Sequence, residues 1–155
     1  MTATVVNLHK QFDIPEYTDI RTCWDMIRSG VEFVLNENPH LTYRPEDVYT
    51  ECVTGKSMLF VSPLGFVVLS VQADPYSEEK VLVIWIAYTH EHGKHNWLDH
   101  MDWFEGVAQY CGCSTIEAQS AVSKLGKFLS ETGWTKESTI YKREVPIDGK
   151  QDKST

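Results

Sequence analysis

An apolar run near the middle of the chain, from Val81 to Tyr88, limits the possible folds more than any other segment. It reads Val-Leu-Val-Ile-Trp-Ile-Ala-Tyr, and its β-branched and aromatic residues favour a strand over a helix. A strand without polar alternation is covered on both faces. The sequence therefore predicts a central strand that lies between two layers of packed elements.

Helical periodicity is present on both sides of this strand. Apolar residues recur at three- and four-residue spacing, Pro45 suits the first turn of a helix, and Gly133 suits a left-handed cap. These signals predict four helices, over about 20–34, 45–55, 97–111 and 121–132. The remaining patterns predict strands over 4–8, 57–62, 66–72 and 113–119, and one or two strands over 134–145.

The length of 155 residues is that of one domain with its own core. We expect a single domain over residues 1–147. Residues 148–155 lack apolar side chains, so a disordered tail is expected there.

The order of these elements resembles the GNAT acetyltransferase fold over almost the whole chain, most closely over residues 81–134. In that family the fourth strand runs into a loop of pattern Arg/Gln-x-x-Gly-x-Gly/Ala. A helix, a Gly-Cys turn, the fifth strand and a helix that ends in Tyr-x-x-x-Gly-Phe follow. The spacing of this chain matches at each point. The resemblance implies an α+β fold whose central sheet is mixed, mostly antiparallel, and flanked by about four helices.

The resemblance also implies a cofactor loop. Counting back from Gly112, the loop falls on His92, Gly93, Lys94, His95, Asn96 and Trp97. In the family, small residues let backbone N–H groups at the helix start approach the coenzyme A pyrophosphate. Here His95 and Trp97 replace them and would crowd the phosphates, whereas Gly93 and Lys94 keep a donor and a positive charge. The loop predicts acetyl-CoA as cofactor if the chain is active, and no cofactor if it is not.

The acid and base of an acyl transfer are less clearly marked. The family's tyrosine, which protonates the departing thiolate, aligns with Leu129, which carries no proton to donate. Tyr88 at the end of the central strand and Glu117 on the following strand are the remaining candidates. Both residues have an equally ordinary structural role in a strand, so the catalytic assignment awaits their geometry.

Histidines in the loop after the central strand suggest a different chemistry. His90, His92 and His95 have His-x-His-x-x-His spacing, from which imidazoles can converge on zinc or nickel. No cysteine lies in the loop to complete such a site, and histidines are also common in hydrated loops. We therefore predict no metal and keep these three residues as its candidate ligands.

Charge and cysteine usage exclude several functions. The net charge of −8, from 22 acidic and 14 basic residues, disfavours binding to nucleic acid and to anionic membrane surfaces. No apolar run approaches the roughly 18 residues that cross a bilayer. No secretory signal is visible, and the cysteines read as core or junction residues, which predicts a reducing cytoplasm.

A narrower resemblance concerns the second half of the chain. The patterns Ile-Glu-Ala at 116–118, Lys-Phe-Leu-x-x-x-Gly-Trp at 127–134 and Tyr-Lys-Arg-Glu-Val at 141–145 are similar to those of small GNAT-like proteins of tailed phages. More loosely, they resemble a short internal virion protein of podophages. This resemblance implies a host-cytoplasmic or virion-associated protein with a protein partner among phage structural proteins.

Two hypotheses of different classes follow. The first is a catalytically degenerate phage-type GNAT-fold protein that acts as a virion- or assembly-associated structural or binding component. The alternative is an acyl-CoA-dependent N-acetyltransferase with an altered cofactor loop. The replaced loop residues favour the first hypothesis. The acceptor substrate, the partner and the oligomeric state stay open.

Overall fold

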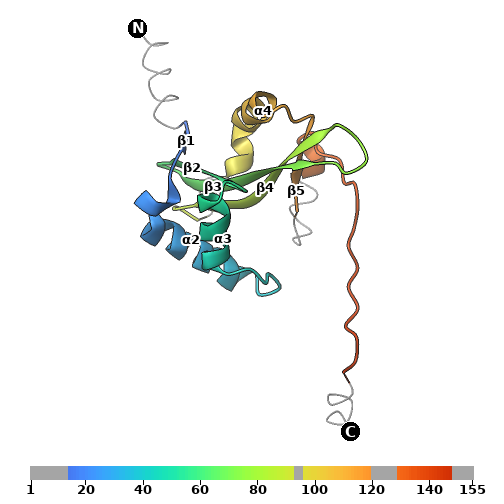
Figure 1. Cartoon of the computed structure of the whole chain (residues 1–155), viewed down its shortest axis with the longest axis horizontal. Helices are drawn as coiled ribbons and strands as arrows, with labels where there is room; N and C mark the ends of the chain where they lie inside the picture. The colour runs from blue at the N-terminus through green and yellow to red at the C-terminus, as the bar shows by residue number, and fades with distance from the viewer. Residues whose placement is uncertain (1–13, 93–95, 120–128, 148–155) are drawn as a thin grey trace. The chain divides into compact units, whose positions relative to one another are not determined.

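The computed structural model describes residues 14–92, 96–119 and 129–147. The chain divides into two compact units, Met1–Gln119 and Ser120–Thr155, which are described separately. In the first unit the elements are β1 (Glu16–Tyr17), the 3₁₀ helix η1 (Ile20–Thr22), α2 (Trp24–Glu37), α3 (Pro45–Val53), β2 (Met58–Ser62), β3 (Gly65–Ala73), β4 (Lys80–Thr89), the 3₁₀ helix η2 (Trp97–His100), α4 (Met101–Tyr110) and β5 (Thr115–Ala118) (Figure 1).

The first unit is built on a five-stranded sheet of order β1-β2-β3-β4-β5. Neighbouring strands are antiparallel except β4 and β5, which are parallel. The predicted α+β class, with a mixed and mostly antiparallel sheet, is confirmed. The predicted strands over 57–62, 66–72 and 81–88 are confirmed as β2, β3 and β4.

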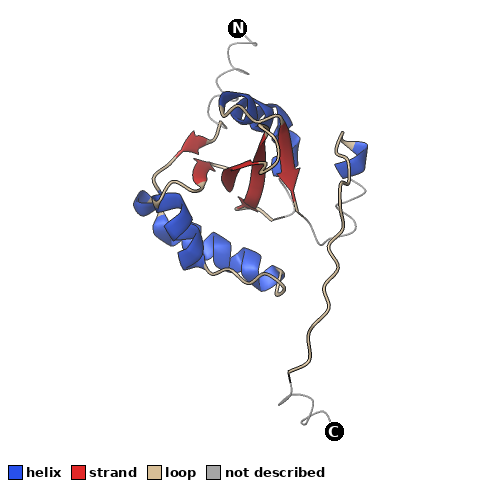
Figure 2. Ribbon diagram, turned by 45° about the vertical axis from the view of Figure 1, so that its right-hand side comes forward, coloured by secondary structure: helices blue, strands red, loops and turns tan. Residues whose placement is uncertain are grey.

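Helices cover both faces of this sheet. Helix α4 lies on one face, and α2 and α3 lie on the other (Figures 1 and 2). On the α2/α3 face the buried core residues are Ile20, Ile27, Val31, Val48, Leu59, Phe66, Val68 and Ile86. On the α4 face they are Val67, Leu69, Leu82, Trp97, Phe104 and Ala108. Burial of β4 from both sides, as its apolar run predicts, follows from these two layers.

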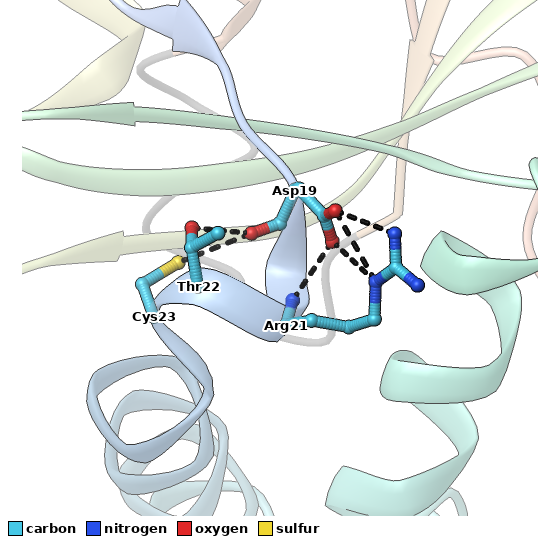
Figure 3. Close-up of polar contacts among 4 residues, drawn as sticks. All are labelled: Asp19, Arg21, Thr22 and Cys23. Carbon is cyan, nitrogen blue, oxygen red and sulfur yellow. Dashed lines mark hydrogen bonds and ion pairs between the residues drawn. The ribbon is translucent and has the colours of Figure 1, made fainter.

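A short 3₁₀ turn, η1, precedes α2 at the start of the first predicted helix, and Figure 3 shows its polar contacts. Asp19 caps η1: its carboxylate accepts the Arg21 backbone N–H at 3.0 Å and the Arg21 Nη2 at 2.8 Å. The hydroxyl of Thr22 donates to the Asp19 carbonyl at 2.7 Å. Helix α2 then begins at Trp24, so the predicted helix is confirmed, with a 3₁₀ turn in place of its first residues.

Helix α2 comes very close to the sheet at Gly30. A Cβ atom there would lie 2.4 Å from Cε2 of Phe66 and 3.1 Å from Cδ2 of Tyr88, whereas nothing lies within 4 Å of one at Gly106 in α4. We expect Gly30→Ala to lower the free energy of unfolding by about 1–3 kcal/mol through overpacking. The matched Gly106→Ala should raise it by about 0.5–1 kcal/mol, because alanine is the better helix former.

Urea unfolding of both variants measures this difference. Since both glycines lie inside helices, the change in helix propensity is the same and the contrast isolates the packing against Phe66. Equal stabilisation by both substitutions would show that α2 does not approach β3 and β4 this closely.

The prediction of strands over 134–145 is wrong. Residues 134–147 form neither helix nor strand, and Ile140, Tyr141 and Val145 are 76%, 90% and 83% exposed. Strand propensity needs a neighbouring backbone to supply hydrogen bonds, and within this described segment no ladder forms. Gly133 does adopt the predicted left-handed cap, with φ +94°.

Several predictions fall outside the described residues: the strand over 4–8, residues 121–128 of the fourth helix and the tail over 148–155. Of that helix, only residues 129–131 are described, and they are helical. The single domain over 1–147 stays a prediction.

Candidate functional site

The sheet opens between β4 and β5. The two strands pair from Val81↔Thr115 to Ile84↔Ala118, and β4 then continues to Thr89. Among the described residues, no strand pairs with β4 on that side beyond Ile84. We call Trp85–Thr89 the open segment of β4. A strand edge without a neighbour presents backbone N–H and C=O groups, which an extended ligand can use.

A β-bulge lies at the start of the open segment. Val68 pairs with Ile86 but Leu69 pairs with Ile84, so Trp85 is an extra residue in β4. Bulges re-aim side chains and are frequent beside functional sites. Here the strand changes face: Ile84 packs with the α4-side core, whereas Trp85, Ile86 and Tyr88 pack on the α2/α3 side.

The hydrogen bonding of the ladder indicates which backbone groups face the opening. The N–H of His90 donates to the Leu64 carbonyl at 2.9 Å, across from β4 to the turn before β3. In an antiparallel ladder, alternate residues direct their groups to opposite sides. This alternation predicts that Ala87 and Thr89 turn their N–H and C=O groups toward the side on which β5 has ended.

Tyr88, a predicted catalytic candidate, lies at the centre of a ring cluster on the α2/α3 face. Its half-buried ring has four aromatic neighbours, with centroid distances of 5.1 Å to Phe66, 6.0 Å to Phe33, and 5.5 Å each to His90 and His92. Phe66 is fully buried and stacks on Tyr88. The ring of Tyr88, a residue of the open segment, is therefore held in place on the α2/α3 face.

Glu117, the other catalytic candidate, is not brought together with Tyr88. It is exposed on β5 and pairs with Val83, which lies five positions before Tyr88 on β4. At about 3.3 Å per residue, the two side chains start on the order of 15 Å apart along the strand. The two residues therefore do not form an acid–base pair. Leu129 belongs to the second unit.

Two of the predicted cofactor-loop residues have defined places at the start of η2. The Asn96 side chain accepts the Leu98 N–H at 3.0 Å and caps the helix. Trp97 is 3% exposed in the α4-side core, and its indole N–H donates to the Tyr88 carbonyl at 2.8 Å. Asp99 adds a negative charge to this first turn. Gly93, Lys94 and His95 lie outside the described residues.

The predicted metal candidates are only partly described. His90 and His92 are exposed and both face Tyr88, whereas His95 lies outside the described residues. In the described part of the chain, no three His, Cys, Asp or Glu side chains gather as metal ligands. The metal hypothesis for these histidines stays untested.

Three of the cysteines, Cys23, Cys52 and Cys113, are poor nucleophiles. Burial raises the pKa of the Cys52 thiol to about 11, and burial also raises the pKa values of Cys23 and Cys113. A thiol with a raised pKa is scarcely ionised at neutral pH, and the thiolate is the reactive form. Cys23 and Cys52 pack against the α2/α3-side core, in line with their reading as core residues.

Arg21 lines two shallow clefts, of about 250 and 360 Å³. One is lined by β1, η1, α3 and Leu59, and the other by α2 and α3 side chains. Neither is lined by a residue of the open segment of β4. Arg21 itself is engaged by Asp19, so these clefts offer no free cation for an anionic ligand.

Sequence reasoning missed the bulge at Trp85 and the ring of Phe33. Nothing in the run Val81–Tyr88 indicates an extra residue, because a bulge is defined by the register with the neighbouring strand. The sequence held one signal for Phe33, a large apolar residue next to the apolar stripe of the first helix. In the structure its side chain is 37% exposed.

Comparison with protein-family models and with curated proteins gives no match. Solved structures do match. An aminoglycoside acetyltransferase from an uncultured soil metagenomic sample, in complex with sisomicin, has a TM-score of 0.62 at 13% identity, over 89% of this chain and 98% of that one. A Trypanosoma brucei acetyltransferase has a TM-score of 0.53 at 14% identity, over 78% and 94% of the two chains.

A V. cholerae integron cassette protein has a TM-score of 0.56 at 13% identity, over 90% of this chain and 96% of that one. At these identities the likeness shows the fold alone, and it supports the GNAT-like fold that the sequence resembles. No helix of the described residues has the length and apolar character to cross a membrane.

Proposed function

We propose that this chain is an acyl-CoA-dependent N-acyltransferase, the acetyltransferase alternative drawn from its sequence. The observation that carries the proposal is the opening beside Trp85–Thr89, where β5 ends and a bulge turns Tyr88 to the α2/α3 face. The fold shared with acetyltransferases supports it.

The described residues fit one part of acetyl-CoA better than another. The pantetheine arm is an extended chain with two amides, and amides pair with an unpaired strand edge as a peptide does. The backbone of Ala87 and Thr89 would hold this arm. At the start of η2, by contrast, the Leu98 N–H is taken by Asn96, and Asp99 is acidic. We therefore assign the binding energy chiefly to the arm.

Acetyl-CoA, when bound, supplies an acyl group activated as a thioester. The chain must then orient the donor, exclude water and move protons from the acceptor amine to the leaving sulfur. Tyr88 is our candidate for the proton transfer, because it belongs to the open segment and its ring is fixed by Phe66. A positioned general acid contributes typically 10²–10⁴-fold in rate, so Tyr88→Phe should lower kcat by that factor with little change in donor affinity.

The first test is thermal unfolding with and without ligand. A ligand at 100 times its Kd stabilises the native state by about 2.7 kcal/mol, so acetyl-CoA should raise Tm by several degrees. Acetyl-pantetheine should also raise it, and adenosine 3′,5′-bisphosphate should raise it less. Stabilisation by the nucleotide alone would contradict our assignment to the arm, and no shift with any ligand would sink the proposal.

A second candidate is a binding component without catalysis, in line with the phage-type reading of the sequence. The burial of Trp97 favours it, because Trp97 occupies a position where the family has a small residue that leaves room for phosphate, and the Asn96 side chain takes up the Leu98 N–H in an internal cap. It predicts no response to any of the three ligands, together with co-purification with a phage structural protein during infection. Absence from purified particles would count against it.

A further inference from the structure

Phe33 and His92 form a ring stack that neither the sequence motifs nor the proposed chemistry explains. Phe33 lies on α2 and His92 lies just after β4. Their ring centroids are 3.9 Å apart and the ring planes differ by 4°. This is the closest ring pair found in the described residues, and it joins two segments far apart in the chain.

The stack is one of several attachments of the segment that follows β4. The His90 N–H donates to the Leu64 carbonyl at 2.9 Å, which fixes the start of the segment. The Trp97 indole donates to the Tyr88 carbonyl at 2.8 Å, which fixes its return to the sheet. Between these two anchors, His92 stacks on Phe33 of α2 and also contacts Tyr88 at 5.5 Å, so its side chain joins the segment to helix α2.

Phe33 is poorly explained as a core residue. It is 37% exposed, and its other ring contact is an edge contact with Tyr88 at 6.0 Å. A partly exposed ring adds less to stability than a buried one, because less apolar surface leaves water. Yet the ring has a defined partner on each side, one in the candidate catalytic cluster and one in the predicted cofactor loop.

We infer that Phe33 is a positioning residue of the acyl-donor site: by stacking on His92, it fixes the course of the chain where it leaves β4. This inference rests on the proposed function. Phe33 would act through His92 rather than by contact with the donor. Its removal should therefore weaken donor binding while the acceptor side and the fold stay as they are.

The test compares Phe33→Leu, Phe33→Tyr and His92→Leu in the full chain. Stacked rings are worth a factor of about two to ten in an equilibrium constant, so we expect Phe33→Leu and His92→Leu to raise the KM for acetyl-CoA by about that factor. The KM for the acceptor and kcat should change little. Phe33→Tyr keeps the aromatic ring, so its KM for acetyl-CoA should equal that of the wild type.

A double-mutant cycle and a control sharpen the assignment. Because the two residues act through one contact, the double variant should be no worse than either single variant. Tyr76→Leu, which removes a ring that is 96% exposed on the β3–β4 connection, serves as the matched control and should leave KM unchanged.

The stack itself has a readout that needs no ligand. A ring stacked on Phe33 should give upfield-shifted His92 imidazole protons in NMR spectra, and this shift should vanish in Phe33→Leu. If the wild-type protein shows the upfield His92 protons but Phe33→Leu binds acetyl-CoA as tightly as the wild type, the positioning role is overturned and the proposed function is left intact. No binding of acetyl-CoA by the wild-type protein would overturn both.

Discussion

Replacing Trp97 by alanine is expected to lower the free energy of unfolding by about 3–5 kcal/mol, the usual cost of truncating a buried tryptophan. The indole is 3% exposed and packs in the α4-side core beside Phe104 at a centroid distance of 6.3 Å. The substitution also removes the 2.8 Å hydrogen bond to the Tyr88 carbonyl. Chemical denaturation measures the loss.

Trp97→Phe is the control that separates packing from hydrogen bonding. It keeps most of the buried volume and loses the indole N–H, so we expect a smaller loss of about 1–2 kcal/mol. The two variants also decide whether the Trp97 side chain belongs to the core or to the cofactor site. Near-wild-type stability of Trp97→Ala, with altered acetyl-CoA binding, would place the side chain in the cofactor site rather than in the core.

Deleting Trp85 is expected to weaken acetyl-CoA binding and to destabilise the protein by several kcal/mol. Without the extra residue, Ile86 still pairs with Val68 and keeps its face, but β4 loses the bend and added twist that the bulge gives it beside the opening. The deletion also removes the half-buried Trp85 side chain from the α2/α3-side core, and truncating a core tryptophan costs up to about 3–5 kcal/mol.

The matched control for the deletion is Trp85→Phe. It keeps the length of β4, and therefore the bulge, while it changes the ring that contacts Tyr43 at 5.1 Å. We expect a loss of less than about 1.5 kcal/mol, as for other core swaps of similar shape. Calorimetric unfolding with and without acetyl-CoA measures both effects. A deletion variant that folds and binds like the wild type would show that the bulge does not position the site.

The candidate site could be predicted from the sequence only in part. Tyr88 follows from its place at the end of an apolar strand, and His92 follows from the spacing of the cofactor loop. The separation of Tyr88 from Glu117 could not be predicted, because it depends on the register of β5 against β4. The role of Trp97 also needed the structure, since loop spacing counts positions and says nothing about burial.

The strand prediction over 134–145 failed because strand pairing depends on distant segments of the chain. Residues 134–145 have strand-forming residues, but a strand exists only where another backbone accepts its hydrogen bonds, and the described segment forms no ladder. For β4 the expectation succeeded because eight consecutive apolar or small residues must be buried wherever they lie.

The amino-acid sequence alone determined the order of the elements from α2 to β5 and the α+β class, because periodicity, Pro45 and the apolar run act over a few neighbouring residues. Only the tertiary structure decided the bulge at Trp85 and the stack of Phe33 on His92. Both depend on which residues of distant segments meet, and that choice is made by the packing of the whole sheet between its helices.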